Sequence, residues 1–304
     1  MAYRLKPHAR IDREIQRVLK EEAESAAEQL RNAARGDKHD DAIHEARKSV
    51  KKIRAVLRLV RPELGGMYRE ENARFRDIGQ KLSALRDAGA MVETFNGLRK
   101  RYGDEIDPRV WDALHQTLLK RKDETEQAVG TRQVFEKYPR ELEAVAKKVD
   151  EWPLHGKGFS VIAPGMKAGF QGGREAMRRA QREPTPENFH EWRKRVKDHW
   201  YHVRLLGEIW GGMMEAYGNV LKDLQTWLGD DHNLAVLRGV IEEAGGGFED
   251  LIPVIERHQA QLREQALIAG VRVYRQKPER LVQWMKFLWN APAEKEEVLE
   301  ELKG

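Results

Sequence analysis

Apolar residues recur at helical spacing along most of the chain, and the positions between them are occupied mainly by Glu, Lys, Arg and Ala. In the segment around position 55, for example, Val50, Ile53, Val56, Leu57 and Val60 fall on one face of a helix at about 100° per residue. Runs of β-branched residues bounded by turn residues, which would indicate strands, are scarce. The pattern therefore predicts an all-α protein.

Turn-forming residues divide the chain into helical segments, and the densest group of them lies near the middle. The loop from Trp152 to Gly165 contains two prolines and three glycines. It predicts a boundary between two halves, residues 1–150 and 151–304. Beyond this loop, Thr185-Pro186-Glu187 combines an N-cap, a proline at the first helical position and an early acid, so a helix is expected to begin there.

One eight-residue block occurs twice. His-Glu-Ala-Arg-Lys-Ser-Val-Lys at 44–51 returns 146 positions later as His-Glu-Trp-Arg-Lys-Arg-Val-Lys at 190–197. The register continues at the same offset, with Arg58 matching Arg204, although the copies align poorly between about 91 and 135. The chain of 304 residues, about twice the usual domain length, is therefore explained as two copies of a four-helix unit.

The repeated block places its cations on one helical face in each copy. These cations are His44, Arg47, Lys48, Lys51, Arg54 and Arg58 in the first copy, and His190, Arg193, Lys194, Lys197 and Arg204 in the second. A solvated helix would interleave acids with these bases at i,i+4, but between His44 and Arg61 seven Lys and Arg residues accompany a single acid, Glu45. The stripe favours an anionic ligand over an ordinary solvated surface.

The donors in the stripe suit phosphate. Arginine offers a planar fork, lysine a mobile charge, and histidine a donor whose charge varies near neutral pH. Fourteen residues separate His44 from Arg58, about 21 Å of helix, which is long enough to follow a polymer. The sequence lacks the glycine-rich phosphate loop of P-loop nucleotide hydrolases.

These two blocks resemble the signature of the CHAD family, the conserved histidine α-helical domain: H-x-x-R-K-x-x-K followed by a further arginine, once in each half. The resemblance covers essentially the whole chain. It implies two similar four-helix bundles related by a pseudo-twofold axis, with the basic helices facing a central groove or pore. Members of the family bind inorganic polyphosphate there, and some associate with polyphosphate granules.

The resemblance implies a polyphosphate-binding role for every cation of the two stripes except Arg58 and Arg204. These two arginines are candidates only because they lie on the same helical arc. One position departs from the signature, because Trp200 stands where the second copy should match Arg54. The resemblance therefore implies asymmetric ligand contacts.

A second block similar to the family pattern places Arg76 ahead of Arg86-Asp87 in the first half and Lys222 ahead of His232-Asn233 in the second. Arg76 and Lys222 are candidate additional contacts to polyphosphate. Surface charge, or pairing with the neighbouring bundle, explains them equally well.

We therefore expect a non-enzymatic protein that binds inorganic polyphosphate, with sulfate or phosphate able to take its place. The alternative is a nucleic-acid-binding helical protein that uses the same basic faces, with Trp200 and Tyr201 as candidates for stacking. Catalysis is not expected, because no nucleophile or carboxylate cluster accompanies the two histidines. His44 and His190 are each followed at i+4 by a lysine, so the helical H-E-x-x-H zinc motif is absent, and neither a metal nor a cofactor is predicted.

Composition narrows the setting of this function. With zero cysteines, the chain has no disulfide, thiolate metal site or cysteine nucleophile. No run approaches the roughly 18 apolar residues of a membrane-spanning helix, and the first twenty residues are too charged for a secretory signal. A cytoplasmic protein is expected, with granule association as the resemblance implies. The net charge of +5 is only a weak pointer to an anionic partner.

Overall fold

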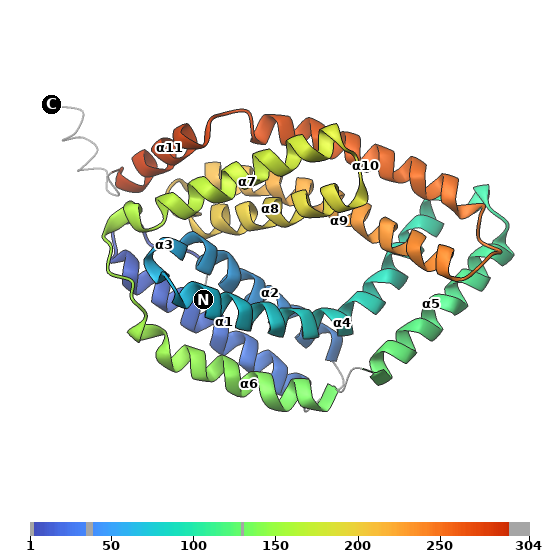
Figure 1. Ribbon diagram of the computed structural model, residues 1–304, viewed down its shortest axis with the longest axis horizontal. Helices are drawn as coiled ribbons and strands as arrows, with labels where there is room; N and C mark the ends of the chain where they lie inside the picture. Colours follow the sequence, from blue (N-terminus) through green and yellow to red (C-terminus); the bar gives the residue numbers. More distant parts are fainter. Residues whose placement is uncertain (1–2, 35–38, 129–130, 292–304) are drawn as a thin grey trace.

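The computed structural model describes residues 3–34, 39–128 and 131–291, with side chains throughout except at 39–40, 84–88, 126–128 and 131–133. Within these residues the chain forms eleven α-helices and three short 3₁₀ helices, with no strand, which confirms the all-α prediction (Figure 1). None of the described helices combines the length and apolar character needed to cross a membrane.

The helices follow one another in the same order in both halves. The first half contains α1 (Ile11–Ala33), α2 (His39–Leu59), α3 (Arg61–Leu64), α4 (Met67–Tyr102), η1 (Gly103–Glu105), α5 (Pro108–Ala128), α6 (Thr131–Lys148) and η2 (Val149–Glu151). The second contains η3 (Gly158–Val161), α7 (Ala163–Arg182), α8 (Pro186–Leu205), α9 (Gly211–Glu243), α10 (Leu251–Val273) and α11 (Pro278–Asn290).

The 146-residue offset of the repeated block also relates the helix starts. Shifted by this offset, α2, α4, α5 and α6 begin within three residues of α8, α9, α10 and α11. Among the described residues each half has five helices of 13 residues or more, one more than the four expected. The additional pair is α5 and α10, which lies where the two copies match poorly in sequence.

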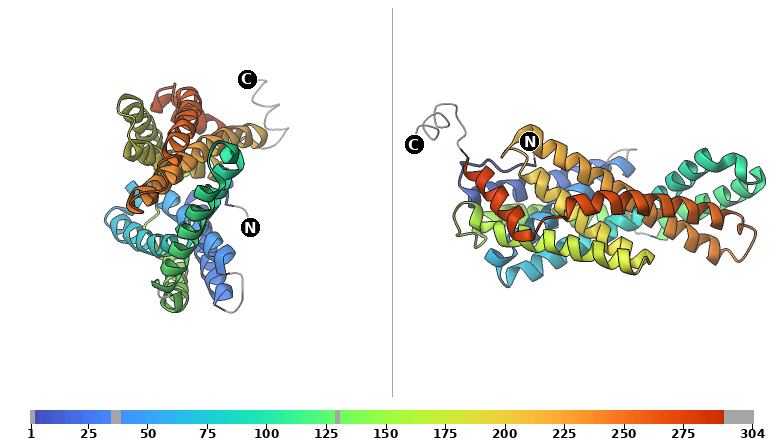
Figure 2. Two further views of the ribbon diagram at one scale, coloured as in Figure 1. Left: turned by 90° about the vertical axis from the view of Figure 1, so that its right-hand side faces the viewer. Right: turned by 90° about the horizontal axis from the view of Figure 1, so that it is seen from above.

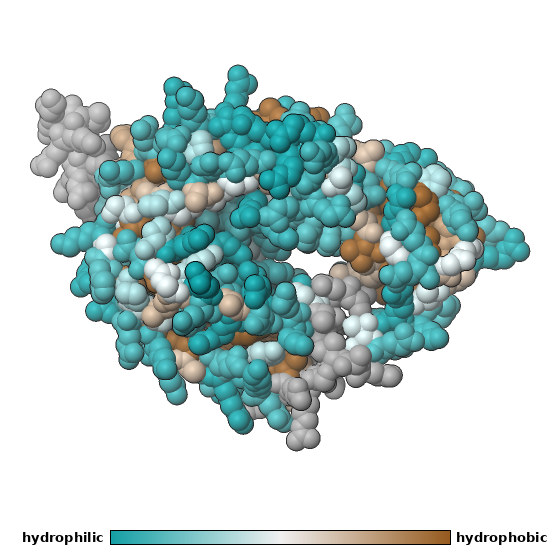
Figure 3. Space-filling model, in the orientation of Figure 1, coloured by the Kyte–Doolittle hydropathy of each residue, from teal (hydrophilic) through white to brown (hydrophobic). Residues whose placement is uncertain are grey.

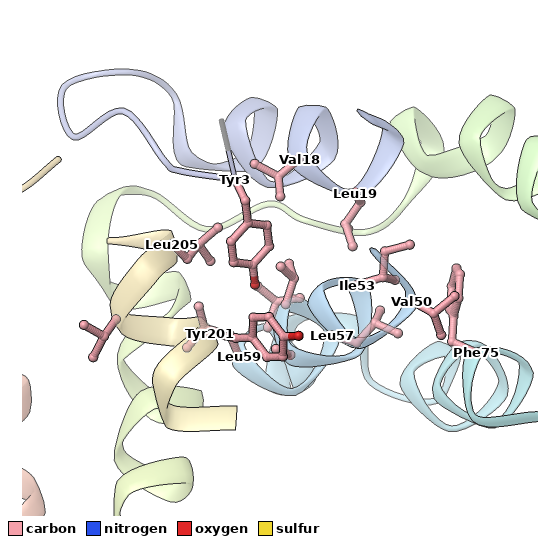
Figure 4. Close-up of a cluster of buried hydrophobic side chains, with 14 of the residues drawn as sticks. Tyr3, Val18, Leu19, Val50, Ile53, Leu57, Leu59, Phe75, Tyr201 and Leu205 are labelled. Atoms are coloured by element: carbon pink, nitrogen blue, oxygen red, sulfur yellow. The ribbon is translucent and has the colours of Figure 1, made fainter. Parts of the chain in front are cut away.

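The first hydrophobic core joins α1, α2, α6 and the beginning of α4 to α7, α8, α11, the beginning of α9 and the end of α10. Its centre contains Ile53 and Leu57 of α2 against Val18 of α1, and Phe75 of α4 lies nearby (Figure 4). The N-terminal segment ties this core to the second half, because the Leu5 amide donates to the Leu205 carbonyl at 2.8 Å. Both halves thus share one core.

The second hydrophobic core lies at the other end of the long helices. Phe95 of α4 and Trp111 of α5 are buried in one cluster with Leu237 of α9 and Ile255 of α10. Figure 2 shows α5 and α10 together at one end of the elongated molecule. Each of α4 and α9 therefore passes from one core to the other, and α5 and α10 cover the apolar faces that the long helices present there.

The two helices with the repeated block are held together by specific contacts. Arg58 of α2 pairs with Asp198 of α8 at 3.0 Å, and His202 Nε2 of α8 lies 2.9 Å from the Ala55 carbonyl oxygen of α2. Close packing of α7 against the end of α2 requires Gly165, where an added Cβ would lie 2.0 Å from the Leu59 carbonyl oxygen. These contacts fix the relative positions of the two basic helices.

The start of α8 is where the sequence predicted it. The Thr185 hydroxyl accepts a hydrogen bond from the Asn188 amide at 3.3 Å, and Pro186 occupies the first turn. Because this cap sets the beginning of the helix, it also sets the rotational position of every cation on it.

Candidate anion-binding site

Cations of α2 and α8 gather around two adjoining hollows. The first hollow, of about 860 Å³, lies between α2, α8 and α9, and the second, of about 670 Å³, is bounded by α2, α4, α5, α8 and α9. Four residues line both hollows, and we call them the junction: His44, Arg47, Lys51 and Lys197. Figure 3 shows the molecule hollowed near its centre. Both copies of the repeated block therefore contribute to one positively charged region.

Lys197 is an electrostatically perturbed cation of the junction. Its pKa is lowered to about 8, first by burial and then by the positive charges of Arg193 and Arg47. A side-chain hydrogen bond with Lys51 and the charge of Asp198 raise the pKa, but each by less than either arginine lowers it. The folded protein therefore disfavours the charged form of Lys197 relative to a lysine in water.

Arg47 is held in place from the neighbouring long helix. Its Nη2 donates to Ser83 Oγ of α4 at 2.9 Å. This contact from α4 helps to position the guanidinium at the junction.

The second hollow adds a pair of histidines. The rings of His190 (α8) and His232 (α9) have centroids 3.9 Å apart, and burial lowers both pKa values, that of His232 to about 4. His190 and the cations Arg193 and Lys194 lower the His232 pKa further. Within the described residues the buried Nδ1 of His190 has no hydrogen-bond partner.

The first hollow contains the remaining cations of the second copy. Arg204 and Lys222 line it, and the Arg204 guanidinium lies 4.7 Å from the centre of the Trp200 ring. Lys52 also lines this hollow but pairs with Glu22 at 2.7 Å, so its charge is compensated. Trp200, which departs from the family signature, therefore contacts the Arg204 guanidinium through its ring but carries no positive charge itself.

The acids of the two repeated blocks form ion pairs that the sequence analysis did not expect. Lys48 pairs with Glu45 at 2.6 Å, and Lys194 pairs with Glu191 at 3.0 Å, each at i,i+3. The inference that the stripe is unneutralised is wrong at these two lysines, because residues at i and i+3 lie only about 60° apart around a helix and are neighbours on its surface. Lys48 and Lys194 are both exposed.

Three of the thirteen predicted site residues line neither hollow. Arg58 pairs with Asp198, Arg54 Nε donates to Asn72 Oδ1 at 3.3 Å, and exposed Arg76 lies 3.4 Å from Asp77. The pKa of Arg54 is lowered to about 10 by burial and then by Arg58. Arg54 and Arg58 share the arc of His44, but α8 packs across that end of α2, which a single-helix projection does not reveal.

The other ten predicted residues line one or both hollows. Among the described residues, five unpredicted basic residues also line them: Arg4 and Lys52 the first hollow, and His232 of α9 and Arg121 and Lys122 of α5 the second. His232 occupies the position that matches Arg86 at the 146-residue offset, so the repeat contained a signal for it. Arg121 and Lys122 belong to the segment where the repeat is weakest. The side chains of Arg86 and Asp87 lie outside the described residues.

Comparison with known families identifies the class of protein. The CHAD domain family model matches residues 14–242, and the chain therefore belongs to the CHAD family. CHAD domains are generally binding domains, and the family is associated with polyphosphate. This membership supports a polyphosphate-related role for the protein.

Solved structures share the fold. The structure titled "Crystal structure of the CHAD domain from the plant Ricinus communis" superposes with a TM-score of 0.62 at 16% identity, covering 96% of each chain. PptA from Streptomyces chartreusis superposes with a TM-score of 0.54 at 13% identity, covering 87% of this chain and 99% of the other. No curated protein matches the sequence.

Proposed function

We propose that this protein binds inorganic polyphosphate without catalysing its turnover, through the junction and the two hollows that share it. The observation that carries the proposal is the convergence of both repeated blocks on four shared residues. The halves 1–150 and 151–304 each supply one basic helix to this site. The expected setting is the cytoplasm, where polyphosphate granules would be the store of ligand.

A polyanionic chain suits this arrangement better than one phosphate does. A single phosphate at the junction would occupy only part of the two hollows, whose linings also include Arg204 and Lys222 in the first and Arg193 and Lys194 in the second. Successive phosphates extending both ways from the junction would meet all of these cations. Arg54, Arg58 and Arg76 are outside the proposed contact set.

The electrostatic state of Lys197 supports the same conclusion. A lysine whose pKa is lowered to about 8 by burial and by neighbouring cations gains free energy when an anion arrives beside it. Ligand charge therefore offsets a repulsion that the folded protein already contains.

The test is binding of long-chain polyphosphate across a series of salt concentrations. Lys51→Ala/Lys197→Ala should weaken binding and reduce the slope of log K against log salt by about two, by analogy with phosphate contacts in nucleic-acid complexes. Lys137→Ala/Lys167→Ala removes the same charge from exposed lysines that pair with Glu141 and Glu279 outside both hollows, and should change neither quantity appreciably.

Competition distinguishes the ligand class. Single-stranded and duplex nucleic acid should displace polyphosphate poorly at physiological salt, and preference for nucleic acid would refute the proposal. Equal affinity of the junction variant and the parent would refute the site. Release of phosphate on incubation with polyphosphate and magnesium would contradict the non-catalytic part.

A further inference from the structure

The second hollow has an apolar wall in addition to its cations. Met91 of α4, Leu118 of α5, and Val236 and Val240 of α9 line it together with the cations of α2 and α8. Val236 is 41% exposed. Figure 3 shows hydrophobic residues beside the central hollow.

This wall is the exposed edge of the second hydrophobic core. Leu118 is buried within that core, and Met91 and Val240 pack against it while partly exposed. The apolar side chains are therefore held by dense packing and remain in place when the hollow is empty of ligand.

An inorganic polyphosphate cannot use such a surface, since it has no apolar atoms to bury. Removing apolar surface from water contributes about 25 cal/mol per Å². A ligand that uses both the cations and the apolar wall has a phosphate group at one end and a hydrocarbon at the other.

We infer that the second hollow binds a phosphorylated amphiphile, specifically an isoprenyl or alkyl diphosphate. Its diphosphate would lie against the junction cations, and its hydrocarbon against Met91, Val236 and Val240. The hollow of about 670 Å³ falls within the range of about 300–1,000 Å³ that is typical of small-molecule sites.

The chemistry of the lining selects a hydrocarbon over a nucleobase. Bases are usually held by stacking on flat rings. Besides His44, the flat rings that line this hollow are those of His190 and His232, which lie against each other at 3.9 Å. The four larger apolar residues are all aliphatic.

This inference uses the same junction cations as the proposed function but does not depend on polyphosphate being the ligand. The amphiphile and long-chain polyphosphate should compete, because both place phosphate at the junction. Each methylene buried against the wall raises affinity about fourfold, so a partly buried hydrocarbon gives a measurable difference.

The experiment measures the affinities of geranyl diphosphate, inorganic diphosphate and geraniol at one ionic strength by calorimetry. Geranyl diphosphate should bind at least about tenfold more tightly than inorganic diphosphate, and geraniol should bind weakly. Geranyl diphosphate binding no tighter than inorganic diphosphate overturns the inference. Adenosine diphosphate is measured in the same way. If it binds more tightly than geranyl diphosphate, the inference is overturned in favour of a nucleotide ligand.

A pair of valine variants locates the site. Val236→Asn should lower the ratio of the two affinities about fivefold while leaving inorganic diphosphate unchanged. Val220→Asn is the matched control, because Val220 is 44% exposed on the same helix and lines neither hollow. Equal effects of the two variants overturn the inference.

Polyphosphate itself separates the two proposals. Polyphosphate that binds but does not displace geranyl diphosphate places the amphiphile elsewhere and overturns the inference. Failure of polyphosphate to bind, with the geranyl diphosphate results as expected, overturns the proposed function and leaves this inference standing.

Discussion

Polyphosphate binding should be accompanied by uptake of protons at Lys197. In the free protein the pKa of this lysine is lowered to about 8 by burial and by Arg193 and Arg47. A polyanion at the junction reverses the effect of the neighbouring cations and returns the pKa toward its usual 10.5. The amine that is uncharged in the free protein then gains a proton in the complex.

The size of the uptake follows from these two pKa values. At pH 8.5 about three quarters of the free amine is unprotonated, and almost none is in the complex, so uptake is about 0.75 proton. At pH 7 the same difference is about 0.1 proton. The affinity should therefore fall with rising pH above 8, with a slope of log K that approaches one proton.

Calorimetry in buffers of different ionisation enthalpy measures this number directly. Long-chain polyphosphate is the suitable ligand, because its terminal phosphates, which titrate near neutrality, are few per chain. Lys197→Arg keeps the positive charge but does not titrate, and should abolish the uptake at pH 8.5 while retaining most of the affinity. An uptake that is absent from the parent, or unchanged in Lys197→Arg, would refute the electrostatic account of the junction.

Two further predictions concern stability and the choice of site residues. His199 is buried against Phe170 and Tyr217, and burial lowers its pKa to about 3. Below pH 6.5 the unfolded chain therefore binds a proton at this histidine that the folded protein does not bind. The free energy of unfolding should fall by about 3 kcal/mol between pH 7 and pH 4.5. Urea unfolding at both pH values tests this, and a His199→Gln protein with the same pH dependence would contradict it. Arg58→Ala should destabilise the fold by about 1–3 kcal/mol by leaving Asp198 without its ion pair, with little effect on polyphosphate binding, whereas Arg204→Ala should show the opposite pattern. Affinity and melting curves for both variants decide between the two assignments.

Much of the fold could be predicted because helical periodicity reports which face of each segment is buried. The all-α class, the start of α8 at Thr185-Pro186 and the correspondence of α2 with α8 all depend on local signals. The role of α5 and α10 could not be predicted in this way. Their apolar faces are visible in the sequence, but α4 is one continuous helix that serves two cores, and periodicity does not identify the partner of each part.

The site shows the same division between local and long-range information. Residues within the eight-residue blocks, such as His44 and Lys197, line the hollows because the helical arc points them there. Arg58 shares that arc but pairs with Asp198, since the crossing of α8 over α2 is a tertiary feature. Lys122 comes from a helix that the repeat relates only weakly, and the apolar wall arises from packing between halves.

The paired glutamates of the two blocks have a consequence for ligand binding. Glu45 and Glu191 hold Lys48 and Lys194 at the rims of the hollows. Each exposed i,i+3 pair contributes only a few tenths of a kcal/mol, and an ammonium group has three N–H donors. A lysine can therefore keep its glutamate and still donate to an anion in the hollow. Because the pairs hold both ammonium groups near the helix surface, Lys48 and Lys194 lose less side-chain freedom when an anion binds than unpaired lysines would.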